Sequence, residues 1–362
     1  MPSNENIKKE IQNISPILKE LGYSLNQTQP HIIGEKLNMQ AVTTASGKKL
    51  ILEGINLKNN EKVIIKITKD PRGIKEIQHE HRCRKALENI IFSYNQFYSP
   101  IEILLTKKGD YLISIQSFIK KEKNFIDLSL EKQFDLSLQG FKTQEGAHAT
   151  TYRHLKSIAK TFGRVNSNWY IKSYKRFQEN ILRKLPQNKE LQTLLEKGLK
   201  ELDENKIIIE QYCNFLTHTD FVPHNFRVVD DKIYLLDHSA IRFGNKYEGW
   251  ARFLNFMTLY NRPLEEALIF FIKNNRTSEE FVSLKMMRIF RLGEIIWYYT
   301  NLLSKTSRDL NTLTKSRIKF WTNVLEAILQ DKLISEKDVN EYKKLRDSLR
   351  SHEEKERQKD LH

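Results

Sequence analysis

The sequence contains only two cysteines, Cys83 and Cys213, among 362 residues. Two cysteines cannot form a zinc site alone, and they do not form the framework of a disulfide-rich secreted domain. The longest apolar runs, such as Ala267–Ile272, are far shorter than the ~20 residues that a membrane span needs. The N-terminus also has no apolar signal core. These absences lead us to expect a soluble, cytoplasmic protein without a membrane partner.

Acidic residues are fewer than basic ones, with 45 Asp and Glu against 60 Lys and Arg, so the formal net charge is +15. A charge of this size raises the alternative of a nucleic-acid-associated protein. The basic residues are scattered, however, and no RNA-binding aromatic motif, zinc finger or long basic run accompanies them. A solvated, lysine-rich surface is therefore the better interpretation, and nucleic acid is the weaker alternative as a partner.

The chain is long enough for two domains, and its character changes near residue 120. Before this point we expect strands and one helix, Ile74–Asn89; the strands are Gln40–Thr44, Lys49–Ile55, Glu61–Thr68, Ile101–Leu105 and Tyr111–Ser117. We assign residues 1–30 to an N-terminal helical extension, 31–118 to an N-terminal lobe and 119–362 to a helical C-terminal lobe.

Helical patterns dominate the second part of the chain. Residues 119–146 are polar and irregular, which predicts a linker with a short element. Residues 151–165 carry an apolar stripe, and 169–205 form a long basic stretch broken by a proline. Residues 247–355 predict about five helices, and the final stretch, Lys343–Gln358, alternates in charge, which is typical of a solvated helix.

Two short β-like runs, Phe226–Val229 and Ile233–Leu236, predict a hairpin. A hairpin brings its two ends together, so Asn225, just before it, and Asp237, just after it, should lie side by side. An amide oxygen and a carboxylate form a hard oxygen site that suits Mg²⁺. Asp220 lies in the same loop and is left free to accept a proton from a hydroxyl group.

This arrangement is the layout of a kinase catalytic loop, written here as His218-Thr219-Asp220, Asn225 and Asp237. The spacing of the histidine, the first aspartate and the asparagine alone is expected on the order of 0.04 times by chance in a chain of this length. A loop with capping side chains is the structural alternative. Three histidines near these carboxylates also raise a transition-metal alternative, but no His-x-x-x-His spacing is present.

A kinase also needs a lysine on its third strand and a helix glutamate that holds this lysine. Lys66 lies in the third predicted strand, although a lysine in such a strand is usually only a surface residue. The following helix offers Glu76 and Glu80, one turn apart. We prefer Glu80, which lies further inside the helix.

With these motifs, the sequence resembles the aminoglycoside phosphotransferase and choline kinase branch of the protein-kinase-like fold. The resemblance covers roughly residues 30–260 and is strongest over residues 217–254, where HTDFVPHNFRVVDDKIYLLDHS parallels the family's catalytic run. It implies an α+β, two-lobed fold. The N-lobe would be a small antiparallel β-sheet with one helix, and the C-lobe would be mostly helical with the catalytic hairpin.

The resemblance also implies roles for individual residues. Asp220 would be the catalytic base, with Asn225 and Asp237 as ligands of Mg²⁺. Lys66 would bind the phosphates of ATP, and Glu80 would orient Lys66. The segment from Gln116 through Phe118 to Ile119 would be the hinge whose backbone meets the adenine.

The sequence departs from the family and from protein kinases at several places. Thr219 replaces the arginine of protein kinases, and no Ala-Pro-Glu follows, which argues against a protein kinase with a phosphorylated activation loop. No Gly-x-Gly-x-x-Gly is present, and only Ser46-Gly47 falls in the first hairpin. The family often has an aspartate before the alanine of the helix after the metal aspartate. Here this brace is missing or shifted to Glu248.

The expected function is transfer of the γ-phosphate of ATP to a hydroxyl of a small molecule, such as a sugar, nucleoside or amino alcohol. Arg242, Lys246 and Arg252 lie beside the site, so a neutral or anionic acceptor fits better than one with several ammonium groups. A pseudokinase-type nucleotide-binding module is the main alternative. The chain has all five polar residues that a kinase site needs, which argues against this alternative; they are Lys66, Glu80, Asp220, Asn225 and Asp237.

Overall fold

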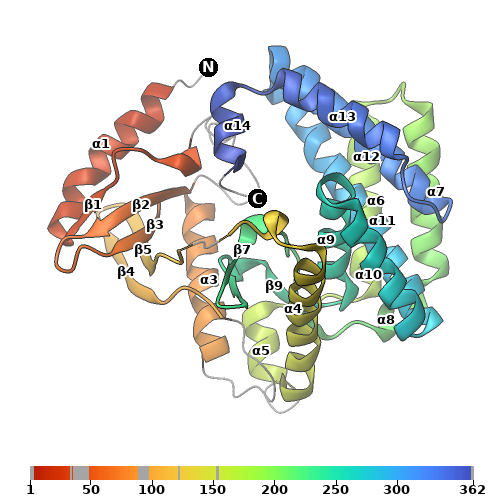
Figure 1. The fold of residues 1–362 in the computed structure, drawn as a ribbon, viewed down its shortest axis with the longest axis horizontal. Coiled ribbons are helices and arrows are strands. Elements are labelled where there is room, and N and C mark those ends of the chain that lie inside the picture. The colour runs from red at the N-terminus through yellow and green to blue at the C-terminus, as the bar shows by residue number, and fades with distance from the viewer. Residues whose placement is uncertain are drawn as a thin grey trace.

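The computed structural model describes residues 4–32, 35, 49–88, 98–120, 123–151 and 155–359. They form a sheet-containing lobe and a helical lobe (Figure 1). The elements of the first lobe are α1 (Asn4–Glu20), β1 (Tyr23–Leu25), β2 (Leu50–Asn56), β3 (Lys62–Thr68), α3 (Pro71–Glu88), β4 (Glu102–Lys108) and β5 (Tyr111–Ser117).

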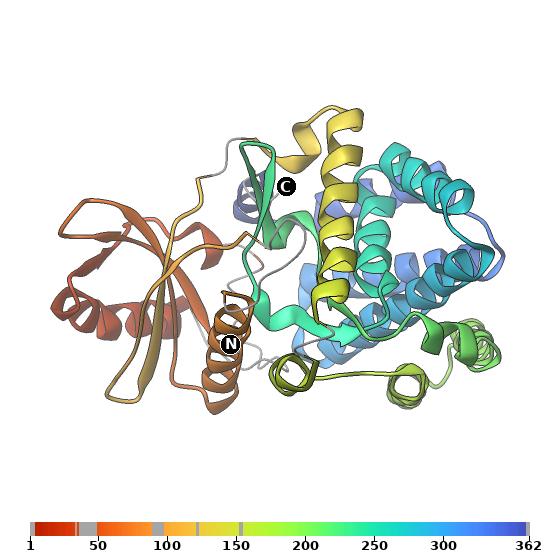
Figure 2. The ribbon, with the colours of Figure 1, turned by 90° about the horizontal axis from the view of Figure 1, so that it is seen from below.

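The five described strands of the N-lobe form one antiparallel sheet in the order β1-β2-β3-β5-β4. Because strand side chains alternate, the sheet has two distinct faces. One face is apolar, and Ile65 and Ile113 lie there in a core shared with Ile14 and Leu18 of α1. The other face carries Lys66 toward α3, which lies between the sheet and the helical lobe (Figure 2).

The structure confirms β2 to β5 and α3 near their predicted positions. The predicted strand Gln40–Thr44 lies outside the described residues. The short strand β1 was not expected, and it extends the sheet by pairing with β2. The predicted N-terminal extension contains α1, which shares the core of the sheet and is therefore an integral part of the N-lobe.

The C-lobe is built on helices, and no described helix is long and apolar enough to cross a membrane. Its helices are α4 (Leu130–Thr151), α5 (Leu155–Phe162), α6 (Ser167–Lys184), α7 (Lys189–Glu204), α8 (Lys206–Gln211), α9 (Tyr247–Tyr260), α10 (Arg262–Asn275), α11 (Ser278–Leu302), α12 (Arg308–Leu329), α13 (Glu336–Leu349) and α14 (His352–Lys359). The long helix α11 packs against α6, α9 and α12 in the main core.

Two strand pairs sit within the helical lobe. β6 (Phe215–His218) pairs with β9 (Ile241–Gly244), and β7 (Phe226–Val229) pairs with β8 (Lys232–Leu235). The second pair is the predicted hairpin. Its turn residues, Asp230 and Asp231, both have positive φ, the geometry that a two-residue hairpin turn requires.

The prediction of a linker with a short element over residues 119–146 is wrong, because α4 occupies Leu130–Thr151. Its buried face mixes apolar residues such as Leu136 and Phe141 with buried Gln133 and Gln144. Polar side chains on the buried face interrupt the apolar period, and this made the segment look irregular in the sequence.

The prediction of one solvated helix over Lys343–Gln358 is also wrong. The segment is divided between α13 and α14, and Glu354 of α14 is only 1% exposed. Its carboxylate accepts a hydrogen bond from the backbone N–H of Glu35, at 3.0 Å. Arg317 of α12 pairs with the Glu35 carboxylate at 2.9 Å, so the C-terminal helices contact a segment that precedes β2.

Candidate active site

The β7–β8 hairpin brings the predicted metal-binding residues together. The N–H of Leu236 donates to the backbone oxygen of Asn225, at 2.9 Å, so Asn225 and Asp237 lie at one end of the hairpin. Nδ2 of Asn225 donates to Oδ2 of Asp220, at 2.7 Å. The loop and the hairpin thus gather Asp220, Asn225 and Asp237 at one place.

The donor set at the hairpin end fits a magnesium ion. Oδ1 of Asp237 accepts hydrogen bonds from the N–H and the hydroxyl of Ser239, at 2.9 and 2.6 Å, while no described residue donates to Oδ2. The amide nitrogen of Asn225 is used by Asp220, which leaves its amide oxygen for a cation. Mg²⁺ commonly binds through one or two protein oxygens and completes its shell with water and phosphate.

No group of three or more His, Cys, Asp or Glu side chains in the described part of the chain could hold a metal ion. Two histidines of the site, His218 and His238, are buried. Nε2 of buried His218 lies 2.7 Å from the backbone oxygen of Asp237, and burial lowers the pKa of His218. Burial, together with Arg84, also lowers the pKa of His238. The transition-metal alternative therefore finds no support among these residues.

The carboxylate of Asp220 is 41% exposed and pairs with an arginine of α9. Nε of Arg252 donates to its Oδ1 at 2.7 Å. Partial burial acts to raise the pKa of Asp220, but the charges of Arg252 and Arg291 outweigh it and lower the pKa to about 2. Asp220 is therefore ionised at neutral pH and can orient an incoming hydroxyl.

The second carboxylate, Asp237, has its pKa held well below the usual range. Burial opposes this shift, and the charges of Lys49 and Lys66 produce it, together with the hydrogen bond from Ser239. A partly buried carboxylate that stays ionised is suited to bind a cation. The charge of Lys49 at this position was not anticipated from the sequence.

Lys66 lies on β3, in the middle of the sheet, and is 5% exposed. Its Nζ lies 2.6 and 2.8 Å from the two carboxylate oxygens of Glu80. It also donates to the backbone oxygen of Leu236, at 3.3 Å. The lysine thus joins the N-lobe to the catalytic hairpin. Glu76, the other helix candidate, pairs with Lys49 instead.

The two predicted hinge residues lie in different settings. Gln116 is inside β5 and buried, and its Nε2 lies 3.4 Å from Oε1 of Glu80. Its side chain therefore belongs to the sheet face that carries Lys66. Phe118 follows the end of β5, and the Lys62 ammonium lies 5.6 Å from its ring centre.

The brace of the catalytic loop comes from α4. Oε1 of buried Gln144 accepts the backbone N–H of His218, at 2.8 Å, and the hydroxyl of Thr217, at 3.4 Å. Gly249 of α9 leaves room for this contact, because a Cβ there would lie 2.9 Å from the His218 oxygen. Glu248 is not the brace, since its carboxylate binds Arg242 and Tyr170.

The sequence analysis does not predict a role for Gln144, because its partner His218 is 74 residues away and the segment is interpreted as a linker. A residue about one turn earlier in α4 also supports the loop. Phe141 stacks on Trp250, with ring centres 3.9 Å apart. It also contacts Phe221, the residue after Asp220, with ring centres 5.2 Å apart. Trp250 and Phe253 are buried in the core.

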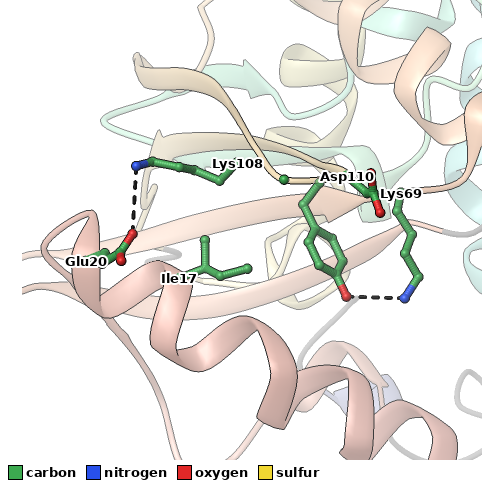
Figure 3. A pocket seen from close by; sticks show the side chains of 7 residues that line it. Ile17, Glu20, Lys69, Lys108 and Asp110 are labelled. Atoms are coloured by element: carbon green, nitrogen blue, oxygen red, sulfur yellow. Dashed lines mark hydrogen bonds and ion pairs between the residues drawn. The ribbon is translucent and has the colours of Figure 1, made fainter.

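A surface hollow of about 330 Å³ lies elsewhere on the N-lobe, between α1 and the β4–β5 turn (Figure 3). Ile17, Lys69 and Tyr111 line it, and Lys69 donates to the Tyr111 hydroxyl at 3.3 Å. None of the predicted site residues contributes to it. We do not identify it with the active site.

Neither a protein-family model nor a curated protein matches the sequence. Solved structures do match the fold. A thermostable mutant of aminoglycoside phosphotransferase APH(4)-Ia has a TM-score of 0.55 and 11% sequence identity, over 78% of this chain and 91% of that one. The chain has the fold of the aminoglycoside phosphotransferases.

Two further solved structures agree on this fold. Spectinomycin phosphotransferase APH(9)-Ia, in complex with ADP and spectinomycin, has a TM-score of 0.53 and 16% identity over 85% of this chain and 93% of that one. ADP-bound APH(2'')-Ib has a TM-score of 0.51 and 16% identity, over 83% and 96%. The predicted two-lobed, kinase-like α+β architecture is therefore confirmed.

Proposed function

We propose that the protein is a phosphotransferase that uses ATP and Mg²⁺ to phosphorylate a hydroxyl of a small molecule. The observation that carries this proposal is the contact between the lobes. Lys66, paired with Glu80, donates to the backbone oxygen of Leu236, the residue directly before Asp237. A cation suited to phosphates and a carboxylate suited to a metal therefore meet at one site.

Each residue of the site has a part in this reaction. Lys66 would hold the phosphates of ATP, and Asn225 and Asp237 would hold Mg²⁺, which neutralises charge on the phosphates. Asp220 would accept a hydrogen bond from the acceptor hydroxyl and direct its oxygen at the γ-phosphorus. The new O–P bond forms, the bond to ADP breaks, and the hydroxyl proton moves to Asp220. The charges of Arg252 and Arg291 lower the pKa of Asp220, so its carboxylate is ionised and able to accept that proton, which then passes to water.

The acceptor that we propose is neutral or anionic, such as a sugar, a nucleoside or a small hydroxy acid. Arg252 pairs directly with Asp220, and the charge of Arg291 also acts on it. An ammonium group beside Asp220 would need carboxylates to offset its desolvation. Efficient phosphorylation of an aminoglycoside such as kanamycin would overturn this choice of acceptor, although not the proposed reaction.

ADP formation from ATP, measured with and without Mg²⁺ and across a panel of alcohols, sugars and nucleosides, tests the proposed reaction. We expect ADP formation to require Mg²⁺ and to rise with a suitable acceptor, with the phosphate recovered on that acceptor. The Asp220→Asn variant should bind nucleotide but lose turnover. Nucleotide binding without any transfer would favour the pseudokinase-type module instead. A shift in the electrophoretic mobility of nucleic acid at both low and high salt, with no nucleotide binding, would favour the nucleic-acid alternative.

A further inference from the structure

A second lysine lies on the sheet face that carries Lys66. Lys49 directly precedes β2, and Ile51, two residues later, is opposite Lys66 in the β2–β3 register. Because side chains alternate along a strand, residues 49, 51 and 66 share one face of the sheet. Helix α3 meets both lysines on this face. Nζ of Lys49 lies 2.6 Å from Glu76, as Nζ of Lys66 lies 2.6 Å from Glu80.

The ammonium groups of Lys66 and Lys49 differ in how many hydrogen-bond acceptors lie within reach of each. An ammonium group has three N–H donors. Lys66 lies within bonding distance of both oxygens of Glu80 and of the Leu236 backbone oxygen. Lys49 has one partner in the described part of the chain, Glu76, although its side chain is only 12% exposed. Two donors of a largely buried ammonium group are thus available to a ligand.

The place of Lys49 indicates what this ligand is. Lys66 donates to the backbone oxygen of Leu236, directly before Asp237, which we propose as a ligand of Mg²⁺. Lys49 lies on the same sheet face, and its partner Glu76 is one helical turn from Glu80, the partner of Lys66. The charges of Asp237, Glu76 and Glu80 also raise the pKa of Lys49 against the opposing effect of burial. An ammonium group that remains charged beside a Mg²⁺ ligand suits the phosphate oxygens that share the metal.

The sequence has no Gly-x-Gly-x-x-Gly motif, the loop that covers these oxygens in protein kinases. We propose that Lys49 is a second phosphate-binding residue, which donates to the terminal phosphate oxygens of the nucleotide while Glu76 orients it. This inference rests on the proposed function, because it assumes that the nucleotide binds between Lys66 and Asp237. It makes α3 a helix that positions two lysines rather than one.

Binding of ATP, ADP and AMP in the presence of Mg²⁺, measured by calorimetry, tests the proposal. We expect Lys49→Met to lower the affinity for ATP by about tenfold to a hundredfold, as for a lost charge-assisted hydrogen bond. The affinity for AMP should stay within about twofold of the wild type. Lys69→Met is the matched control, because Lys69 pairs with Glu10 in the same lobe but lines the hollow of Figure 3. It should change neither affinity.

Two further variants separate binding from folding. Lys49→Arg keeps the charge and should keep most of the preference for ATP over AMP. Glu76→Gln should reduce this preference less than Lys49→Met. The ratio of the two dissociation constants does not depend on the fraction of folded protein, so a destabilised variant still gives an answer.

The outcomes distinguish the inference from the proposed function. If the wild-type protein binds ATP and Lys49→Met has the same ratio of ATP to AMP affinity, Lys49 does not contact the terminal phosphates and the inference is wrong. An equal loss of ATP and AMP affinity would also contradict it. Absence of Mg²⁺-dependent ATP binding in the wild-type protein would instead overturn the proposed function.

Discussion

The two lobes hold their functional groups by different kinds of contact. In the N-lobe, Lys66 is held by the opposite charge of Glu80, 14 residues further along the chain. In the C-lobe, the loop that carries Asp220 is held by a neutral amide, Gln144, 74 residues before its partner His218. Charged pairs on neighbouring elements can be recognised in a sequence, whereas a neutral brace from a distant helix cannot.

The difference also has an energetic side. Removing one partner of a buried ion pair leaves an uncompensated charge, which costs about 3–5 kcal/mol. Removing a neutral partner leaves one buried N–H without an acceptor, which costs about 1–3 kcal/mol. The N-lobe should therefore respond to substitution mainly through stability, and the C-lobe mainly through the position of Asp220.

The largest effect should come from Asp220 itself. Asp220→Asn keeps the shape of the side chain but cannot accept the hydroxyl proton, so we expect turnover to fall by about 10²–10⁴ with nucleotide affinity nearly unchanged. Single-turnover kinetics and calorimetry on the same protein measure the two quantities. Turnover within a few-fold of the wild type would remove Asp220 from the mechanism.

In the N-lobe, we expect substitution of Glu80 to lower stability more and substitution of Lys66 to lower nucleotide affinity more. Glu80 also binds Arg84, at 3.0 Å, so Glu80→Gln leaves two cations without a carboxylate, whereas Lys66→Met leaves Arg84 paired. We expect Glu80→Gln to cost more free energy of unfolding, about 3–5 kcal/mol. Lys66→Met should cost more ATP affinity.

Denaturant unfolding and calorimetry on both variants and on the double variant check this order. Because the two residues act through one pair, their effects should be less than additive. Full additivity would show that Lys66 and Glu80 act independently. A larger loss of ATP affinity in Glu80→Gln than in Lys66→Met would show that the glutamate has a role beyond the lysine.

In the C-lobe, Gln144→Leu should lower turnover by about tenfold to a hundredfold, because the loop loses its acceptor for the His218 N–H and Asp220 moves. Gln144→Glu keeps an acceptor oxygen and should retain most of the activity. Amide exchange of the segment around His218 should rise in Gln144→Leu.

Gln133→Leu is the matched control for this brace. Gln133 is a buried glutamine of the same helix that donates to the backbone oxygens of Ile126 and Leu128, away from the catalytic loop. It should lower stability without a comparable loss of turnover. Equal losses of turnover in the two leucine variants would mean that Gln144 only stabilises the helix.

The smallest effect concerns pH. The pKa of Asp220 is lowered to about 2 in the folded protein, below the ~3.9 of a free aspartate. A lowered pKa contributes stability that is present above the unfolded value and is lost as pH falls through the folded value. Turnover should therefore show no loss from Asp220 protonation down to about pH 4. The stability contribution should disappear between about pH 4 and pH 2.

A pH–rate profile and acid unfolding of the wild type and Arg252→Gln measure this shift. Removing the Arg252 guanidinium should move the acid limb of both curves to higher pH. An unchanged acid limb would mean that Arg252 does not set the charge of Asp220.

Much of the fold and site could be predicted where the determining interactions are local. The turn residues Asp230 and Asp231 lie between two short apolar runs, and this local pattern alone specifies the hairpin that brings Asn225 to Asp237. Lys66 and Glu80 belong to consecutive elements, so their pairing could be anticipated. The roles of these residues remain proposals.

Other features depend on contacts between distant segments. Local spacing made Glu76 and Glu80 alternatives for one lysine, and only the β2–β3 register brings Lys49 to Glu76. Helix packing likewise makes Gln144 the brace of the catalytic loop. The sequence by itself determined the hairpin and the order of its polar residues, because turn geometry and strand alternation act over a few residues. The tertiary structure decided which partner holds each group, because a buried polar atom takes whichever partner the packing brings within bonding distance.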